Sequence, residues 1–208
     1  MVQSLARDVP RVGRRAVERR ILAGAAVGAA VSALLAVAVL GLRDDLGTAA
    51  RGAALWTKVA YTLSLALAAV AMSMRLARPG RAPGRVAWVT AVPVLLLGAL
   101  GAVELTRTPP ADRMALWLGE SWASCPWLVL ALAVPVFAGL LRAYRRLAPT
   151  RLRAAGAAAG LTAGALAATV YCLHCPEASA LFVLTWYSLG IVLAALAGAL
   201  LGPLLLRW

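Results

Sequence analysis

The sequence predicts an all-α membrane protein, in which six transmembrane helices form a single helical bundle with both termini in the cytoplasm. Three observations lead to this fold class. First, 62% of the 208 residues are hydrophobic and 14% are charged, whereas soluble domains carry about 45–50% apolar and about 25% charged residues. Second, the apolar residues gather in long blocks. Third, segments rich and poor in Lys and Arg alternate along the chain.

The apolar blocks give the spans in order. Each is close in length to the ~20 residues that a helix needs to cross ~30 Å of hydrocarbon, and alternating β-barrel patterns are absent. The first block is too long for the apolar region of a cleaved signal peptide, so it is interpreted as a helix. The second contains Lys58 near its start, where a lysine side chain can extend to the membrane surface. The predicted spans are residues 21–42, 53–76, 86–105, 121–141, 154–173 and 179–206.

The positive charges predict the orientation. Residues 1–20 form a basic leader, and residues 21–208 form one transmembrane domain. Of the 21 Lys and Arg residues, 16 lie in the leader, in residues 75–85 and 142–153, and at Arg207. Because positive residues near span ends stay cytoplasmic, these segments are predicted inside, in a multi-pass protein of a bacterial inner membrane. Topology thus accounts for the net charge of +13, and no direct contact with nucleic acid is expected.

Small residues recur at four-residue spacing within three of the spans. Such a pattern lets two helix backbones approach each other closely. The predicted packing residues are Gly24, Gly28, Gly156, Gly160, Gly164, Gly198 and Gly202.

The stretch "VYCLHCPEAS" (residues 170–179) gathers two of the three cysteines, the only histidine and an acidic residue. The predicted topology places it on the outer face with "ESWASCPW" (residues 120–127), which holds the third cysteine. There the thiols would meet an oxidising compartment. The candidate sensing residues are Cys125 and Cys175, and the candidate supporting or metal-binding residues are His174, Glu177, Cys172 and Glu120.

Three chemistries fit these residue types. A thiol beside a histidine can form a reactive thiolate and be oxidised. Cys, His and Glu side chains also bind soft or borderline metal ions, so a transient metal ion is the one cofactor considered. Cys172 and Cys175 form a C-x-x-C, the spacing of thiol–disulfide exchange. Simpler interpretations stay open, with Cys172 as an apolar residue of the fifth span and His174 as a cap for its last carbonyls.

Several function classes lack their usual signals. No nucleotide-binding loop, HExxH or serine-nucleophile motif is present, and no charge lies in the middle of a span. Pumps and proton-coupled transporters usually need ionisable groups at that depth. The chain is therefore expected not to be an enzyme, and small-molecule export is disfavoured.

Four features occur together: a leader with "SLARDVPRV", six spans, a "CPW" at the start of the fourth, and "LHCPE" followed by "LFVLTWYSLGI". Together they resemble the NrsF-type (negative regulator of sigma F) membrane anti-sigma factors over the whole chain. The resemblance implies a cytoplasmic partner, an extracytoplasmic-function sigma factor, which is released under metal or oxidative stress. It also implies roles or matches for particular residues: Cys125 and Cys175 as the sensing pair, without Cys172; Leu5, Val9 and Val12 as sigma contacts; and Phe182, Trp186, Tyr187 and Gly190 in the motif that follows.

The leading prediction is a membrane-embedded anti-sigma factor that releases its sigma factor when cysteines on the periplasmic side sense heavy-metal or oxidative stress. The alternative is a membrane thiol–disulfide oxidoreductase that exchanges electrons with a quinone through Cys172 and Cys175. The two hypotheses differ in what should copurify with the chain, a sigma factor or a quinone.

Overall fold

The computed structural model describes residues 14–78, 80–82, 84–147 and 149–207, and within these ranges the chain forms helices joined by turns and loops, without any strand. Six of its helices are long and apolar enough to cross a membrane, which confirms the predicted number and fits a membrane protein. They are Arg15–Leu40, Ala53–Leu76, Val86–Arg107, Cys125–Tyr144, Leu152–Tyr171 and Ala180–Leu205.

Short turns divide or join several of these spans. The fourth span begins at Cys125, later than the predicted start at residue 121, because residues 119–124 form turns before it. The elements in order are α2 (Arg14–Leu35), η1 (Ala36–Leu40), α3 (Leu46–Ala49), α4 (Ala53–Leu76), α5 (Val86–Val89), α6 (Ala91–Arg107), η2 (Pro110–Asp112), α7 (Arg113–Leu118), α8 (Cys125–Tyr144), α9 (Leu152–Tyr171), α10 (Ala180–Phe182), η3 (Val183–Tyr187) and α11 (Ser188–Leu205).

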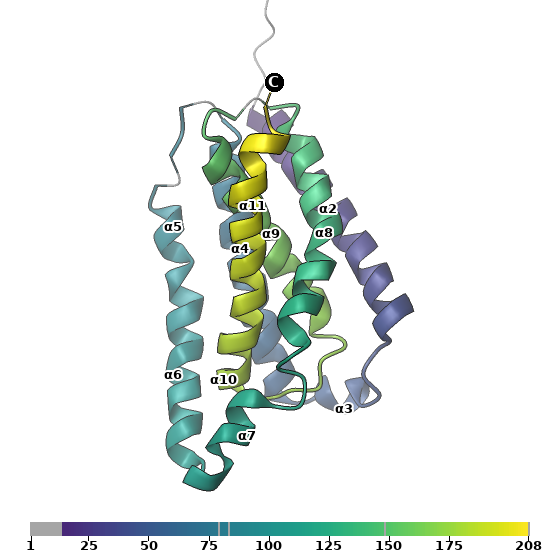
Figure 1. The fold of residues 1–208 in the computed structure, drawn as a ribbon, viewed down its shortest axis with the longest axis vertical. Coiled ribbons are helices and arrows are strands. Elements are labelled where there is room, and N and C mark those ends of the chain that lie inside the picture. The colour runs from purple at the N-terminus through teal and green to yellow at the C-terminus, as the bar shows by residue number, and fades with distance from the viewer. Residues whose placement is uncertain (1–13, 79, 83, 148, 208) are drawn as a thin grey trace, which may run out of the picture.

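Helix α9 forms the centre of the bundle. Helices α4, α8 and α11 pack around it, α2 packs against α8, and α6 lies along one side with its main contact to α10 (Figure 1). In the most apolar stretch of α9, 67% of the residues are buried, whereas in that of the span that contains α6 only 11% are buried. Large apolar side chains such as Leu95 and Leu100 are exposed on α6, as expected of a surface that faces lipid.

Glycines set the closest helix contacts. On α9, Gly156 lies against Gly198 and Gly202 of α11, and Gly160 lies against the backbone at Ala194. In the second seam, Gly24 of α2 meets Gly139 of α8, a partner that the sequence pattern did not include. The remaining predicted glycines, Gly28 and Gly164, also approach backbone atoms of a neighbouring helix, at Val136 and Ile191 respectively.

The alternating directions of the helices create two distinct ends. The described residues of the arginine-rich segments (14–20, 77–78, 80–82, 84–85, 142–147, 149–153 and 205–207) gather at one end, which we call the arginine end (Figure 1). The three cysteines gather with α3, α7 and α10 at the opposite end, the cysteine end. The charge-poor and charge-rich connections thus lie on opposite ends of one bundle.

The glycine seam between α9 and α11 leads to a test. A Cβ on Gly160 would collide with backbone at Ala194 and Ala195, whereas one on Gly98 of α6 would meet only a side-chain methyl of Leu184 at 3.8 Å. We expect Gly160→Ala to lower the free energy of unfolding by about 1–3 kcal/mol, because backbone cannot move aside cheaply.

The measurement is thermal unfolding in detergent, followed by tryptophan fluorescence. Gly98→Ala is the matched control, since it makes the same change in a helix with room for the methyl group. Equal melting temperatures for the two variants would contradict the close approach of α9 and α11.

Candidate functional site

The site is built around a non-helical stretch, residues 172–179, which we call the cysteine segment. After α9 the amides of His174 and Cys175 both donate to the Tyr171 carbonyl at 3.0 Å, which ends the helix in a tight turn. The chain then runs without helical hydrogen bonds to Ser179, whose hydroxyl accepts from the Phe182 amide and caps the sixth span. Cys172, His174, Cys175 and Glu177 therefore lie on one short connection between two spans.

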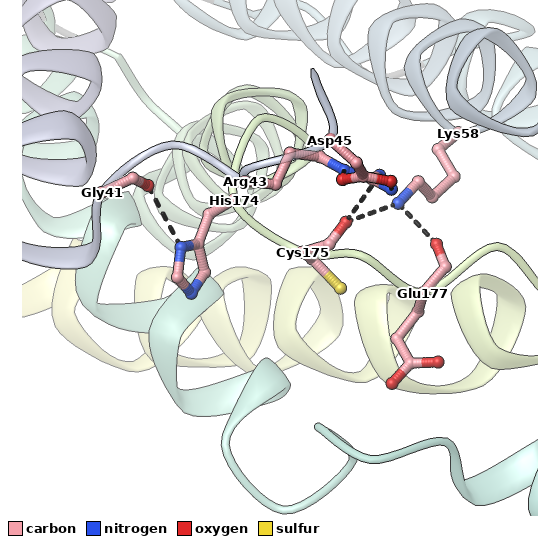
Figure 2. Close-up of polar contacts among 7 residues, drawn as sticks. All are labelled: Gly41, Arg43, Asp45, Lys58, His174, Cys175 and Glu177. Carbon is pink, nitrogen blue, oxygen red and sulfur yellow. Dashed lines mark hydrogen bonds and ion pairs between the residues drawn. The ribbon is translucent and has the colours of Figure 1, made fainter. Parts of the chain in front are cut away.

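Lys58 of α4 holds the backbone of this segment. Its amino group donates to the carbonyls of Cys175 at 2.9 Å and Glu177 at 2.6 Å (Figure 2). The Arg43 guanidinium donates to the same Cys175 carbonyl at 3.3 Å. Lys58 was expected to extend to the membrane surface, but it is only 1% exposed. That expectation is wrong, because carbonyls inside the bundle supply the partners that water would otherwise provide.

The loop after the first span binds the other side of the segment. The Arg43 amide donates to the Leu173 carbonyl at 3.1 Å, and the ring nitrogen Nδ1 of His174 donates to the Gly41 carbonyl at 3.1 Å. His174 thus contacts Gly41 rather than the last carbonyls of the fifth span. Arg43 forms a two-bond ion pair with Asp45 at 2.6 and 2.7 Å. These hydrogen bonds lower the pKa of Asp45 and raise the pKa of Arg43.

Glu177 fastens the segment to the linker between α7 and α8. Its carboxylate accepts hydrogen bonds from the amides of Glu120 at 2.7 Å and Ser121 at 3.2 Å, and from the Ser121 hydroxyl at 3.3 Å. Gly119 makes this approach possible, since its φ is +58° and a Cβ there would lie 2.6 Å from the carboxylate. Glu120 contributes its backbone amide here, rather than the carboxylate that the sequence analysis considered.

All three cysteines are free thiols and fully buried. The sulfur of Cys175 lies 3.8 Å from the Ser121 hydroxyl, and the Cys125 amide donates to the Ser121 carbonyl at 2.9 Å. Ser121 therefore connects the Cys175 side chain to the start of α8, where Cys125 lies. Cys172 lies just beyond α9, and its thiol donates to the Ala168 carbonyl at 3.2 Å. Burial raises the pKa of the Cys172 thiol to about 11, so it stays protonated near neutral pH.

Aromatic rings surround the thiols on the side of the sixth span. The ring of Tyr187 lies 5.5 Å from that of Tyr171 and 6.4 Å from that of Phe182. Tyr187 ends the π-helical turn η3 and is fully buried. Farther out, Trp186 packs against Trp117 and donates to its carbonyl at 2.9 Å. These contacts help to keep water from the thiols.

The proposed metal ligands do not come together. In the part of the chain that the structure describes, no group of three or more His, Cys, Asp and Glu side chains is arranged to hold a metal ion. The reason is visible in the contacts above, since His174 is engaged by Gly41 and the Glu177 carboxylate by backbone amides of the linker. The His174 imidazole and the Glu177 carboxylate, which would complete a metal site with the thiols, thus already have structural partners.

Sequence reasoning missed Lys58, Arg43 and Glu104. One carboxylate oxygen of Glu104 accepts from the Ser179 hydroxyl and the Ala180 amide, at 3.1 and 2.8 Å, so α6 caps the start of the sixth span. The usable signal for Lys58 was a lone charge within an apolar block. The proposed sigma contacts Leu5, Val9 and Val12 lie outside the described residues.

The fold and the site define a class, a six-helix bundle of membrane-protein character with buried thiols in a hydrogen-bonded segment at one end. Residues 5–208 match the family described as negative regulator of sigma F, NrsF, and the chain belongs to this family. This confirms the resemblance found in the sequence.

Two relatives carry the family name. The probable anti-sigma-F factor NrsF of Azospira oryzae is 47% identical, covering 87% of this chain and 85% of that protein. The anti-sigma-F factor NrsF of Caulobacter vibrioides is 40% identical, covering 100% of this chain and 98% of that protein. No solved structure matches the chain. The relatives are thus regulators rather than enzymes by name.

The Glu177 contacts give a second test. We expect Glu177→Ala to lower the free energy of unfolding by about 1–2 kcal/mol, because it leaves the Glu120 and Ser121 amides without their acceptor. Glu120→Ala is the control, since the amide at that position remains. Thermal unfolding in detergent measures both, and an equal loss in the two variants would show that the Glu177 carboxylate does not hold the linker.

Proposed function

We propose that this chain is a membrane-embedded anti-sigma factor that holds an extracytoplasmic-function sigma factor at the bacterial inner membrane and releases it under stress. The observation that carries the proposal is the family match over residues 5–208, together with two relatives named anti-sigma-F factors. Residues 1–20 are the proposed sigma-binding element, with Leu5, Val9 and Val12 as apolar contacts. No enzymatic step is part of this function.

The arginine end is proposed to face the cytoplasm and the cysteine end the periplasm. The support is that the arginine-rich connections and the C-terminal Arg207 share one end of the bundle. Positive residues near span ends stay on the cytoplasmic side. In this orientation, the leader lies on the cytoplasmic side of the first span, the side where the sigma factor is.

Cys125 and Cys175 are the proposed sensing pair. The Cys175 thiol lies beside Ser121, which is bonded to the backbone amide of Cys125, and oxidation of the two thiols to a disulfide needs only the two sulfurs. Each thiol loses one proton and one electron as the S–S bond forms. Hydrogen peroxide, the simplest oxidant for this step, takes up both electrons and both protons and leaves as two water molecules. A thiophilic metal ion would instead displace the two protons and bind the thiolates transiently, with further ligands recruited by rearrangement.

Modification of buried thiols must change the balance between two packings of the bundle. To shift a population from 1:99 to 99:1 takes about 5.5 kcal/mol, and a disulfide contributes typically about 2–4 kcal/mol. Cys125 begins α8, and α8 packs on α2 through Gly24 and Gly139. A shift at the start of α8 is therefore passed to α2, whose first residues (14–20) belong to the leader.

Replacement of the thiols tests the sensing step. In cells that carry Cys125→Ser or Cys175→Ser, we expect sigma-dependent transcription to stay repressed and stress induction to be abolished, because serine forms neither a disulfide nor a soft-metal bond. Cys172→Ser is the control and should keep induction. A reporter fused to a sigma-dependent promoter gives the measurement, with copurification of the sigma factor as a check on binding. Full induction in the double variant would refute thiol sensing.

Single cysteines test the orientation. Because the native thiols are buried, the probes are Asp112→Cys and Arg81→Cys, both at exposed positions, in a chain with all native cysteines replaced by serine. An impermeant maleimide should label Asp112→Cys in intact cells, and Arg81→Cys only after the inner membrane is opened. The reverse pattern would place the cysteine end in the cytoplasm and remove the basis for periplasmic sensing.

A further inference from the structure

Lys58 is a buried cation beside the proposed sensing residue Cys175, and its amino group is directed at the backbone of the cysteine segment. Two of its three N–H donors are used by the Cys175 and Glu177 carbonyls. The ring of Tyr187 lies 6.0 Å from the amino group, at the outer limit of a cation–π contact. The side chain is therefore fixed at the centre of the site, although it belongs to a different span.

Lys58 forms its hydrogen bonds with the backbone of the cysteine segment, not with its side chains. The carbonyls of Cys175 and Glu177 point toward its amino group, while the Cys175 sulfur and the Glu177 carboxylate point away from it (Figure 2). The sulfur and carboxylate instead face the linker that leads to Cys125. The segment thus has two sides, a backbone side that Lys58 binds and a side-chain side where the proposed thiol chemistry takes place.

We propose that Lys58 is the positioning residue that holds Cys175 in its repressing geometry and passes its displacement to α4, an inference that rests on the proposed function. Bonding of Cys175 to Cys125 or to a metal pulls the backbone of the segment toward the linker. The Cys175 carbonyl then leaves Lys58. A buried amino group without partners is unfavourable in an apolar bundle, so Lys58 and the first turns of α4 must move as well.

Helix α4 connects this movement to the arginine end. Near its other end, the Ser73 carbonyl accepts from the Tyr144 hydroxyl of α8 at 3.1 Å, and the Ser73 hydroxyl lies 3.1 Å from that of Thr162 on α9. Just beyond α4, Arg78 forms an ion pair at 3.4 Å with Glu18 of α2. Helix α8, which begins at Cys125, and helix α4, which carries Lys58, therefore both contact α2, whose first residues (14–20) belong to the leader.

Three variants separate this role from a general contribution to stability. Lys58→Met removes the donors but keeps an unbranched side chain. Lys58→Arg keeps donors that can reach both carbonyls. Arg51→Gln removes a positive charge from an exposed position just before α4 and serves as the charge control. Membrane levels of each chain are measured by immunoblotting.

The first readout is thiol accessibility and does not depend on any sigma factor. In chains whose only cysteine is Cys175, we expect Lys58→Met to raise the rate of modification by N-ethylmaleimide about tenfold or more, since even one of the two lost charge-assisted hydrogen bonds shifts a local equilibrium by that factor. Lys58→Arg and Arg51→Gln should stay within about twofold of the parent. A second probe, Leu97→Cys in a chain without other cysteines, reports a buried position of α6, which is outside the proposed path, and should not change.

The second readout is transcription from the sigma-dependent promoter. We expect Lys58→Met to raise unstressed transcription about tenfold, with little further induction by stress, while Lys58→Arg stays repressed. The double variant Lys58→Met with Cys175→Ser should be as active as Lys58→Met alone, because Lys58 acts after the thiol.

Four results would overturn the inference. Unchanged labelling of Cys175 in Lys58→Met, increased labelling of Leu97→Cys, loss of the chain from the membrane, or failure of Lys58→Arg to restore repression would make Lys58 a structural residue only. If the serine variants keep stress induction while Lys58→Met still opens Cys175, the proposed thiol sensing fails and the positioning role stands.

Discussion

The structure depends on how it satisfies a non-helical backbone inside an apolar bundle. Outside helices, buried amides and carbonyls must find partners from side chains or other loops, because an unpaired buried backbone group is unfavourable. In the cysteine segment these partners are Arg43, Lys58 and Glu104, each from a different connection or span. One short stretch therefore fastens three hairpins together at the cysteine end.

The two ends of the bundle are held in different ways. At the cysteine end, hydrogen bonds of buried and half-buried groups join every neighbouring connection to one segment. At the arginine end, the Arg78–Glu18 pair is about one-third exposed on both sides, at 30% and 35%, and exposed ion pairs contribute little. Between the ends, glycine seams such as Gly24–Gly139 bring backbones together without polar bonds. The cysteine end is therefore held mainly by hydrogen bonds, and α2 is held to α8 through its glycine seam and the hydrogen bond from Arg20 to the Arg146 carbonyl.

The sequence predicted the helices well and the site only in part, for a physical reason. Hydropathy and glycine spacing act within one helix, so six spans and the packing glycines were accessible from local pattern. The partners of Lys58, His174 and Glu177 arise from segments more than 50 positions away, as the contacts of Lys58 with Cys175 and of Glu177 with Glu120 illustrate. Residue types at the site were therefore predictable, whereas the carbonyls and amides that engage them were not.

Burial of the thiols follows from the same constraint and determines how such a sensor would respond. A segment held by Lys58, Arg43 and Glu177 keeps Cys125 and Cys175 away from solvent, and so the reactive state is a minor population. The apparent sensitivity of a minor state falls in proportion to its population. The hydrogen bonds of the segment would thus set the stress threshold, and a change at Lys58, Arg43 or Glu177 would shift that threshold without any change in the sulfur chemistry.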